Sequence, residues 1–264
     1  MTTGRMTTGR MSRVCMSRVA VVTGGASGIG LAVSRRLAER GDCVAVFDID
    51  PEAAARAADE INANAEWGRA FGVGVDVTDR PGIEAALDKV RGEFGPVEIM
   101  VTSAGVTGYA KFTDMTIEDW ERIIRVNLTG TFHCLQPVIP EMITAGWGRI
   151  VTISSSSAQS GAPGMAHYSA SKGGVIAMTK SLAVELGPYG ITVNTIPPRA
   201  IDTPMSRISP MTGQAMNWEQ TAARLPVRRP GVPDDIAAAC AFLVSDDASY
   251  ITGQVIGVNG GGYI

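Results

Sequence analysis

Tyr168 and Lys172 lie four residues apart near the start of a predicted helix over residues 168–186, so their side chains share one face. A tyrosine hydroxyl has a pKa of about 10 in water and is a poor base at neutral pH. A neighbouring ammonium group stabilises the phenolate and lowers that pKa, so the pair could move a proton to or from an alcohol oxygen. The spacing alone also fits a surface pair on a helix, and the interpretation therefore depends on the residues around it.

Such a proton transfer needs a second hydroxyl that positions the substrate oxygen, and Ser155 is the candidate. It belongs to the run Ile153-Ser-Ser-Ser-Ser157, which follows a predicted strand over residues 148–153. In open α/β folds, ligands bind at the carboxyl ends of the strands. Ser155 would therefore lie where a ligand binds, and Ser154 is the second choice.

A glycine-rich turn, Thr23-Gly-Gly-Ala-Ser-Gly-Ile-Gly30, lies between a predicted buried strand over 19–22 and a helix over 29–40. Its glycines let the backbone approach a ligand closely, and the helix N-terminus presents free N–H groups to negative charge. An ordinary strand-to-helix turn has a similar composition. Here, however, strand, turn, helix, second strand and an acid follow in order, which predicts a bound dinucleotide.

The acid is Asp48, at the end of the second predicted strand. A carboxylate at this place accepts hydrogen bonds from the adenosine ribose hydroxyls and repels the additional phosphate of NADP. The glycine turn contains no arginine or lysine that would neutralise that phosphate, and none follows Asp48 immediately. The sequence therefore favours NAD over NADP, although Asp48 also fits an exposed loop carboxylate like Asp50 and Glu52.

Short apolar runs alternate with helical patterns from Val19 onward, which predicts right-handed βαβ crossovers and a parallel sheet covered on both faces. We expect one α/β domain over residues 18–264, a Rossmann-type doubly wound sheet of about seven strands. An irregular stretch rich in Met, Pro and Gly, at about residues 203–225, breaks the alternation and is expected to be a substrate lid. Strands are expected at 19–22, 43–47, 98–101, 148–153, 191–196 and 254–258, and a further one, the third in the chain, is expected to end at 75–76.

The composition is that of a globular protein, with 264 residues, 45% hydrophobic, 19% charged and a net charge of −3. No block of like charge favours a nucleic acid or a membrane surface as a partner. The four cysteines form no CxxC pair and there are two histidines, so neither a metal site nor a disulfide framework is expected. These features fit a reducing, cytoplasmic compartment.

The first twenty residues are two tandem five-residue duplications, MTTGR-MTTGR and MSRVC-MSRVA, and residues 1–17 of them precede the first predicted strand. They contain little apolar surface, so we expect a disordered or non-catalytic tail. Met11 or Met16 could be the true start of the protein.

Taken together, the motifs resemble the short-chain dehydrogenase/reductase family, in its single-domain branch, from about residue 18 to the C-terminus. The matching segments are TGGASGIG at 23–30, DVTD at 76–79, NLTG at 127–130, ISS at 153–155, YSASK at 168–172 and TGQVIGVNGG at 252–261.

The resemblance implies a catalytic tetrad of Asn127, Ser155, Tyr168 and Lys172. In it, Ser155 binds the substrate oxygen, Tyr168 moves the proton, Lys172 binds the nicotinamide ribose and tunes Tyr168, and Asn127 holds a water that relays protons. Expected cofactor contacts are Gly24, Ser27, Gly28, Ile29, Gly30, Asp48, Asp76, Val77, Ala104, Gly105, Tyr168, Lys172, Pro198, Ile201 and Thr203. Expected substrate contacts are Ser155, Gln159, Met165, Tyr168 and Met205, with Thr107, Tyr109, His167, Met211, Met216 and Trp218 as further parts of the pocket wall.

Two positions depart from the family pattern. Thr102-Ser103 replaces the usual pair of asparagines after the fourth strand, and Arg199 replaces a glycine after Pro198. The Arg199 guanidinium either points to solvent or pairs with an acid such as Asp202, or it contacts a carboxylate or phosphate of substrate or cofactor.

The expected function is that of an NAD(H)-dependent oxidoreductase that interconverts a secondary alcohol and a ketone. The alternatives are an NADPH-dependent 3-oxoacyl thioester reductase and a non-catalytic cofactor-binding regulator. We expect a homotetramer, with a dimer as second choice, assembled through the helices at about 117–143 and 168–186. The sequence does not identify the substrate.

Overall fold

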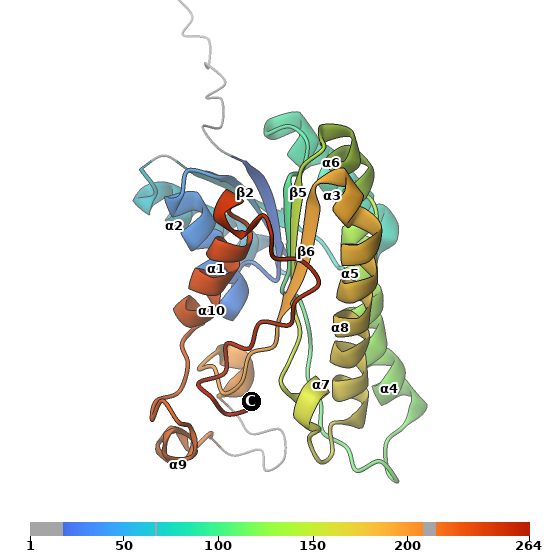
Figure 1. The fold of residues 1–264 in the computed structure, drawn as a ribbon, viewed down its shortest axis with the longest axis vertical. Coiled ribbons are helices and arrows are strands. Elements are labelled where there is room, and N and C mark those ends of the chain that lie inside the picture. Colours follow the sequence, from blue (N-terminus) through green and yellow to red (C-terminus); the bar gives the residue numbers. More distant parts are fainter. Residues whose placement is uncertain (1–17, 67, 208–214) are drawn as a thin grey trace, which may run out of the picture.

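Six parallel strands form one sheet in the order β3-β2-β1-β4-β5-β6 in the computed structural model, which describes residues 18–66, 68–207 and 215–264 (Figure 1). The chain order reverses between β1 and β4, and ligands bind at such a switch point in open α/β sheets. The strands are β1 (Val19–Thr23), β2 (Cys43–Asp48), β3 (Arg69–Gly74), β4 (Ile99–Thr102), β5 (Gly148–Ile153) and β6 (Ile191–Ile196).

Helices cover both faces of this sheet, as Figure 1 shows. On one face pack α1 (Gly28–Glu39), α2 (Pro51–Asn64) and α10 (Pro233–Leu243). On the other pack α3 (Arg80–Glu93), α5 (Gly130–Leu135), α6 (Ile139–Ala145) and α8 (Ala166–Leu186). Because both faces are covered, every residue of β1, β4, β5 and β6 is buried, the polar ones included. The expected α/β architecture is confirmed.

The expected seventh strand is wrong, because Val255 makes only an isolated bridge to Thr195 of β6. The side chain of Asn194 also contacts the segment before that bridge. Its Oδ1 accepts from the N–H of Gln254 at 3.0 Å, and its Nδ2 donates to the carbonyl of Ile251 at 2.7 Å. The segment is therefore held to the sheet edge by this amide side chain together with a few backbone hydrogen bonds, and it does not form a strand.

The long helix expected after residue 116 is interrupted. It begins as α4 (Ile117–Ile124), becomes π-helical over Arg125–Thr129 and continues as α5. A π-helical turn inserts an additional residue per hydrogen-bonded ring and often occurs at functional sites. Here the inserted turn contains Asn127, whose side chain is buried.

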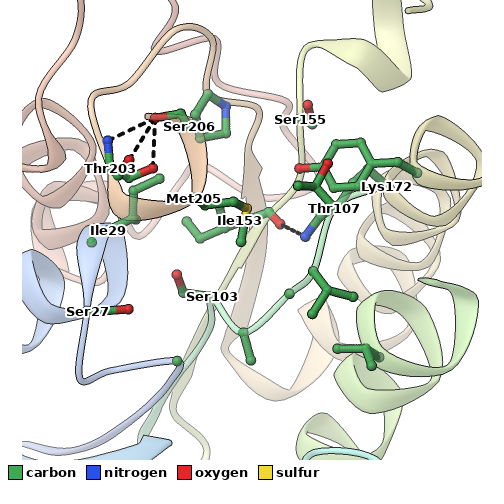
Figure 2. A pocket seen from close by; sticks show the side chains of 18 of the residues that line it. Ser27, Ile29, Ser103, Thr107, Ile153, Ser155, Lys172, Thr203, Met205 and Ser206 are labelled. Carbon is green, nitrogen blue, oxygen red and sulfur yellow. Dashed lines mark hydrogen bonds between the residues drawn. The ribbon is translucent and has the colours of Figure 1, made fainter. Parts of the chain in front are cut away.

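The carboxyl ends of the strands and the loops after them surround a pocket (Figure 2). The short helices near it are α7 (Ser157–Ser160) and α9 (Trp218–Arg224). In the described parts of the chain, no helix is both long and apolar enough to cross a membrane.

The predicted tail over residues 1–17 lies outside the described residues. Cys134 and Cys240 are free and buried.

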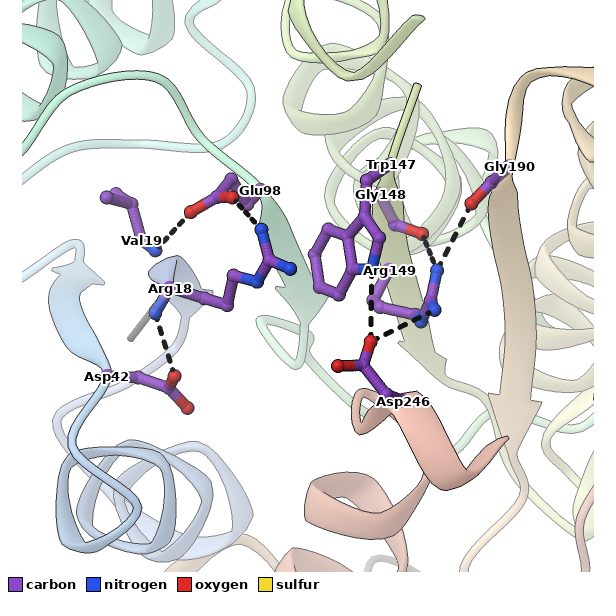
Figure 3. A network of polar contacts seen from close by, with 9 residues as sticks. All are labelled: Arg18, Val19, Asp42, Glu98, Trp147, Gly148, Arg149, Gly190 and Asp246. Atoms are coloured by element: carbon purple, nitrogen blue, oxygen red, sulfur yellow. Dashed lines mark hydrogen bonds and ion pairs between the residues drawn. The ribbon is translucent and has the colours of Figure 1, made fainter. Parts of the chain in front are cut away.

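A cation–aromatic cluster closes the opposite, amino-terminal edge of the sheet (Figure 3). The guanidinium groups of Arg18 and Arg149 lie on opposite sides of the Trp147 indole, 3.9 and 4.3 Å from the ring centre. Asp246 accepts from the indole N–H at 3.2 Å and pairs with Arg149 at 3.6 Å, and Arg18 pairs with Glu98. The cluster thus joins the starts of β1, β4 and β5 to the C-terminal part of the chain.

We predict that Trp147→Leu lowers the free energy of unfolding by about 1–3 kcal/mol, because it removes both cation–π contacts while retaining an apolar side chain. Trp147→Phe keeps an aromatic face between Arg18 and Arg149 and should lose less than half as much. Denaturant unfolding of the three proteins measures this. Equal losses for the two variants would show that indole volume, and not its aromatic face, stabilises this edge.

Candidate active site

One pocket of about 600 Å³ lies over the switch point, a volume typical of small-molecule sites. It brings together most of the residues that the sequence predicts for cofactor and substrate. The predicted residues that line it are Gly24, Ser27, Gly28, Ile29, Asp48, Asp76, Val77, Ala104, Gly105, Ser155, Met165, Tyr168, Lys172, Pro198, Ile201, Thr203 and Met205. Among the expected catalytic residues and the expected cofactor and substrate contacts, Gly30, Asn127 and Gln159 do not line it.

Tyr168 and Lys172 project from the first two turns of α8 into this pocket, and Ser155 follows β5 beside them. The ammonium of Lys172 donates to the carbonyl of Ile153, the last residue of β5, at 2.9 Å (Figure 2). Ser154, the second choice for the substrate hydroxyl, is buried, and its Oγ accepts from Thr195 at 3.0 Å. Ser155 is therefore the serine of this pair whose hydroxyl is placed to act with Tyr168.

Burial raises the pKa of Tyr168, and its hydrogen bond with Ser155 lowers that pKa. Burial also lowers the pKa of Lys172 to about 8. The ammonium of Lys172 donates to the Ile153 carbonyl, and the expectation that it lowers the pKa of Tyr168 stays a prediction. Ser155 is the group whose hydrogen bond favours the phenolate here.

Asn127 does not line the pocket but supports the loop after β4, which does. Its Oδ1 accepts from the N–H of Val106 at 2.8 Å, and its Nδ2 donates to the Val106 carbonyl at 3.0 Å and to Ser171 Oγ at 3.1 Å. These bonds tie the π-helical turn to the loop after β4 and to α8. The side chain is thus committed to protein partners, and its role in holding a water stays a prediction.

The glycine turn after β1 makes close backbone contacts that a side chain would prevent. A Cβ on Gly30 would lie 2.1 Å from the carbonyl oxygen of Gly24, and one on Gly24 would lie 2.9 Å from the Cα of Ala104. Gly30 therefore acts by packing rather than by lining the pocket. Gly28 has a φ of +51°, which L side chains rarely adopt, and a Cβ here would be in van der Waals contact with Thr203 at 3.5 Å. The N-terminus of α1 and Thr203 both line the pocket, and the free N–H groups at a helix N-terminus suit a pyrophosphate group.

Asp48 ends β2 at the edge of the same pocket. Its carboxylate accepts from the N–H of Ala26 in the glycine turn at 3.2 Å and from the N–H of Asp50 at 3.3 Å. Two backbone donors therefore hold the carboxylate beside the turn. This position fits the binding of ribose hydroxyls by a dinucleotide site.

Thr203 and Ile201 lie on the loop after β6, which a single serine organises. Ser206 Oγ accepts from the N–H of Thr203 at 2.9 Å and donates to the carbonyl of Ile201 at 2.6 Å, as Figure 2 shows in part. On the adenosine side, Asp76 Oδ1 accepts from the N–H of Thr78 at 2.8 Å and so shapes its own turn.

The structure brings only some of the residues expected in the substrate wall to the pocket, and their role stays a prediction. Met165, Met205, Met216 and Thr107 line the pocket, whereas Tyr109, Gln159, His167 and Trp218 do not. Met211 lies outside the described residues. The periodicity of a sequence does not specify the direction of side chains in a loop or in the first turn of a helix. Residues such as Tyr109 and His167 were for this reason expected at the pocket although they do not line it.

His167 is buried, although it precedes Tyr168 directly. A Cβ on Gly108 would lie 3.1 Å from its Nε2, so the imidazole packs against the loop after β4. Burial lowers the pKa of His167, and Asp119 raises it to a lesser degree.

Arg199 is exposed and does not line the pocket. Its stem packs over the backbone of Gly262, where a Cβ would lie 2.7 Å from Arg199 Cδ. Asp202, the acid expected as its partner, pairs with Arg207 at 3.3 Å instead. The solvent-facing interpretation of Arg199 therefore agrees with the structure, without the predicted ion pair.

The sequence analysis missed several residues that line the pocket, among them Ser103, Arg125, Ser157 and Ser206. Ser157 and Ser206 could have been noticed as hydroxyl groups two and three residues beyond predicted site residues. Arg125, the first residue of the π-helical turn, has no such signal in the sequence.

Comparisons with known proteins agree with this geometry. The family model that matches, described as enoyl-(acyl carrier protein) reductase, covers residues 24–262. The 3-oxoacyl-[acyl-carrier-protein] reductase FabG of Thermotoga maritima is 40% identical over 245 residues, 92% of this chain and 96% of that protein. The FabG of Escherichia coli is 40% identical over 249 residues, 93% of this chain and 97% of that protein.

Two further proteins widen the range of similar activities. The (2S)-[(R)-hydroxy(phenyl)methyl]succinyl-CoA dehydrogenase subunit BbsD of Thauera aromatica is 39% identical over 243 residues, 92% of this chain and 95% of that protein. A crystal structure of a variant actinorhodin polyketide ketoreductase with NADPH superposes with a TM-score of 0.86 at 34% identity. It covers 93% of this chain and 97% of that one.

We predict that the buried Lys172 makes stability depend on pH. Its pKa is about 8 in the folded protein and 10.5 when exposed, so between these values the unfolded chain binds more protons and stability rises with pH. Lys172→Met removes this dependence. The stability advantage of the variant over the wild type should therefore be larger at pH 7 than at pH 10, by on the order of 1–3 kcal/mol.

Denaturant unfolding of the nucleotide-free proteins at both pH values measures this difference. Lys180→Met, at an exposed position of the same helix, is the matched control and should show no such change. A constant difference between Lys172→Met and the wild type at both pH values would contradict a lowered pKa for Lys172.

Proposed function

The chain belongs to the short-chain dehydrogenase/reductase family, and on that premise we propose that it is an NAD(H)-dependent oxidoreductase interconverting a secondary alcohol and a ketone. The observation that carries the proposal is the convergence of Tyr168, Ser155 and Lys172 in the pocket that also contains Asp48. Both members of the tyrosine–lysine pair are present, which argues against a non-catalytic regulator.

Each side chain has a role that its contacts support. Tyr168 transfers the proton to or from the substrate oxygen, while Ser155 donates a hydrogen bond to that oxygen as its charge develops. Lys172, held by the Ile153 carbonyl, presents its remaining N–H groups toward the pocket. A nicotinamide held beside Pro198, Ile201 and Thr203 would supply or accept the hydride.

The preference for NAD rests on Asp48. Two backbone N–H groups fix its carboxylate at the end of β2. The residues of the glycine turn that line the pocket, Ser27 among them, are uncharged. A fixed carboxylate repels a 2′-phosphate and accepts from a 2′-hydroxyl.

A second candidate is an NADPH-dependent 3-oxoacyl thioester reductase. The names of the FabG relatives favour the 3-oxoacyl substrate, and the ketoreductase structure with NADPH favours that nucleotide. In that reaction the same tyrosine would protonate the 3-oxo group. The two candidates differ in cofactor and in substrate, and Asp48 is the residue that argues for the first.

We also propose that the substrate binds beside residues 203–207 and 215–225, the described parts of the expected lid; its residues 208–214 lie outside the described residues. Met205 and Met216 of this segment and Met165 across the pocket present thioether side chains, which adapt to apolar ligands of different shape. With Arg199 outside the pocket, an uncharged and largely apolar alcohol or ketone fits this half best.

The expected homotetramer stays a prediction. Its support is two exposed apolar side chains on the helices expected to form the interface, Val184 of α8 at 81% and Phe132 of α5 at 44%. Apolar side chains exposed on such helices fit an interface between copies of the chain.

We predict that kcat/KM is at least tenfold higher with NAD(H) than with NADP(H), about 1.4 kcal/mol of discrimination. Asp48→Asn keeps the size of the side chain and an acceptor for the Ala26 N–H but removes the charge, so the preference should shrink at least tenfold. The measurement uses a panel of cyclic, aromatic and aliphatic secondary alcohols and ketones, with acetoacetyl-CoA as the thioester.

Asp50→Asn is the matched control, because asparagine caps a helix as well as aspartate does and Asp50 does not line the pocket. Its cofactor preference should equal that of the wild type. Equal efficiency of the wild type with both nucleotides would contradict the role of Asp48. If the wild type turns over acetoacetyl-CoA with NADPH and none of the other substrates, the second candidate is established.

A further inference from the structure

Ser155 is hydrogen-bonded twice by the same neighbour. The hydroxyl of Ser157 donates to Ser155 Oγ at 2.9 Å, and the backbone N–H of Ser157 donates to the same oxygen at 3.2 Å. Ser157 is the first residue of α7 and lines the pocket. Both donors therefore come from the start of a helix that directly follows the catalytic strand end.

This arrangement decides which way the Ser155 hydroxyl can act. A hydroxyl has one proton and two acceptor lone pairs, and Ser157 supplies a donor for each lone pair. The proton of Ser155 is left to be donated, and donation is what a carbonyl or developing alkoxide oxygen requires. Hydrogen bonds in such a chain also polarise one another, so each donor strengthens the next.

We propose that Ser157 is a positioning residue that fixes Ser155 as a hydrogen-bond donor toward Tyr168 and the substrate oxygen. The inference rests on the proposed function, since it assigns Ser155 and Tyr168 to the same proton-transfer step. The direction of the chain is Ser157 O–H to Ser155 Oγ, and Ser155 O–H to the tyrosine or substrate oxygen.

The other hydroxyls nearby are engaged elsewhere. Ser154 Oγ accepts from Thr195, and Ser160, at the end of α7, donates to the carbonyls of Ser156 and Gly161. Ser157 is thus the hydroxyl that the described residues place on Ser155.

The charged groups around Tyr168 do not take this role. Lys172, on the same helix, donates to the Ile153 carbonyl. The other ionisable side chains that line the pocket are Arg125 on the π-helical turn, Asp48 at the end of β2 and Asp76 after β3. The hydrogen bond with Ser155 lowers the pKa of Tyr168 against the effect of burial, in agreement with a Ser155 that donates.

The test compares Ser157→Ala, which removes the O–H donor but keeps the N–H, with Ser157→Thr, which restores a hydroxyl. Ser160→Ala, in the same short helix but away from the pocket, is the control. The first readout needs neither nucleotide nor substrate: the ¹³Cζ resonance of Tyr168 across a pH titration, assigned by its loss in Tyr168→Phe. The second is kcat/KM in the wild-type and Ser155→Ala backgrounds.

We expect Ser157→Ala to lower the acid dissociation constant of Tyr168 about threefold or more and to lower kcat/KM about 3- to 10-fold, as for one net hydrogen bond. Ser157→Thr should return both to within twofold of the wild type, and Ser160→Ala should change neither. In the Ser155→Ala background, Ser157→Ala should have no further effect, because its action passes through Ser155.

An unchanged Tyr168 resonance and an unchanged kcat/KM in Ser157→Ala would overturn the proposal, and so would a loss of equal size in the Ser155→Ala background. If the wild type turns over none of the alcohols and ketones, the proposed function fails. The titration of Tyr168 in Ser157→Ala still decides the role of Ser157 in that case.

Discussion

The burial of the Lys172 ammonium at the end of β5 is the constraint on which the rest of the site depends. A buried amine is stable only where an oxygen accepts its protons, and the carbonyl of Ile153 is that acceptor. This bond fixes the first turns of α8 against the end of β5. Tyr168, one turn earlier, is thereby placed beside Ser155, so one polar contact sets the geometry of all three groups.

Gly105 shows how tightly three segments meet around this amine. A Cβ at this position would lie 3.1 Å from Asn127 Oδ1 and 3.4 Å from Lys172 Nζ. The loop after β4 can pass here because it has no side chain, and Asn127 then binds the backbone of the next residue, Val106. The π-helical turn is what directs Asn127 inward. The catalytic end of the sheet is therefore assembled by hydrogen bonds between buried side chains and the backbone of neighbouring segments.

Local pattern predicts the parts of this structure that depend on local physics. The alternation of apolar strands and helices predicts the parallel sheet. The glycine turn followed by Asp48 predicts the side of the sheet on which the pocket lies, and Tyr168 with Lys172 predicts the helix that faces it. What failed depends on contacts distant in sequence. Residues 254–258 meet β6 at one isolated bridge and not as a seventh strand, the π-helical turn breaks the expected long helix, and Gln159 and His167 do not line the pocket. Neither periodicity nor composition specifies where a side chain in a loop or a helix end will point.

The central claim is that Tyr168 transfers the proton, and Tyr168→Phe tests it most directly, because the ring and its packing stay while the hydroxyl is removed. The measurement is kcat together with the equilibrium binding of NAD(H), which separates chemistry from cofactor affinity. The account predicts a fall in kcat of at least about 100-fold with binding nearly unchanged, the range for a lost general acid/base. Retention of a tenth or more of the wild-type turnover would contradict it and would assign the proton to another group.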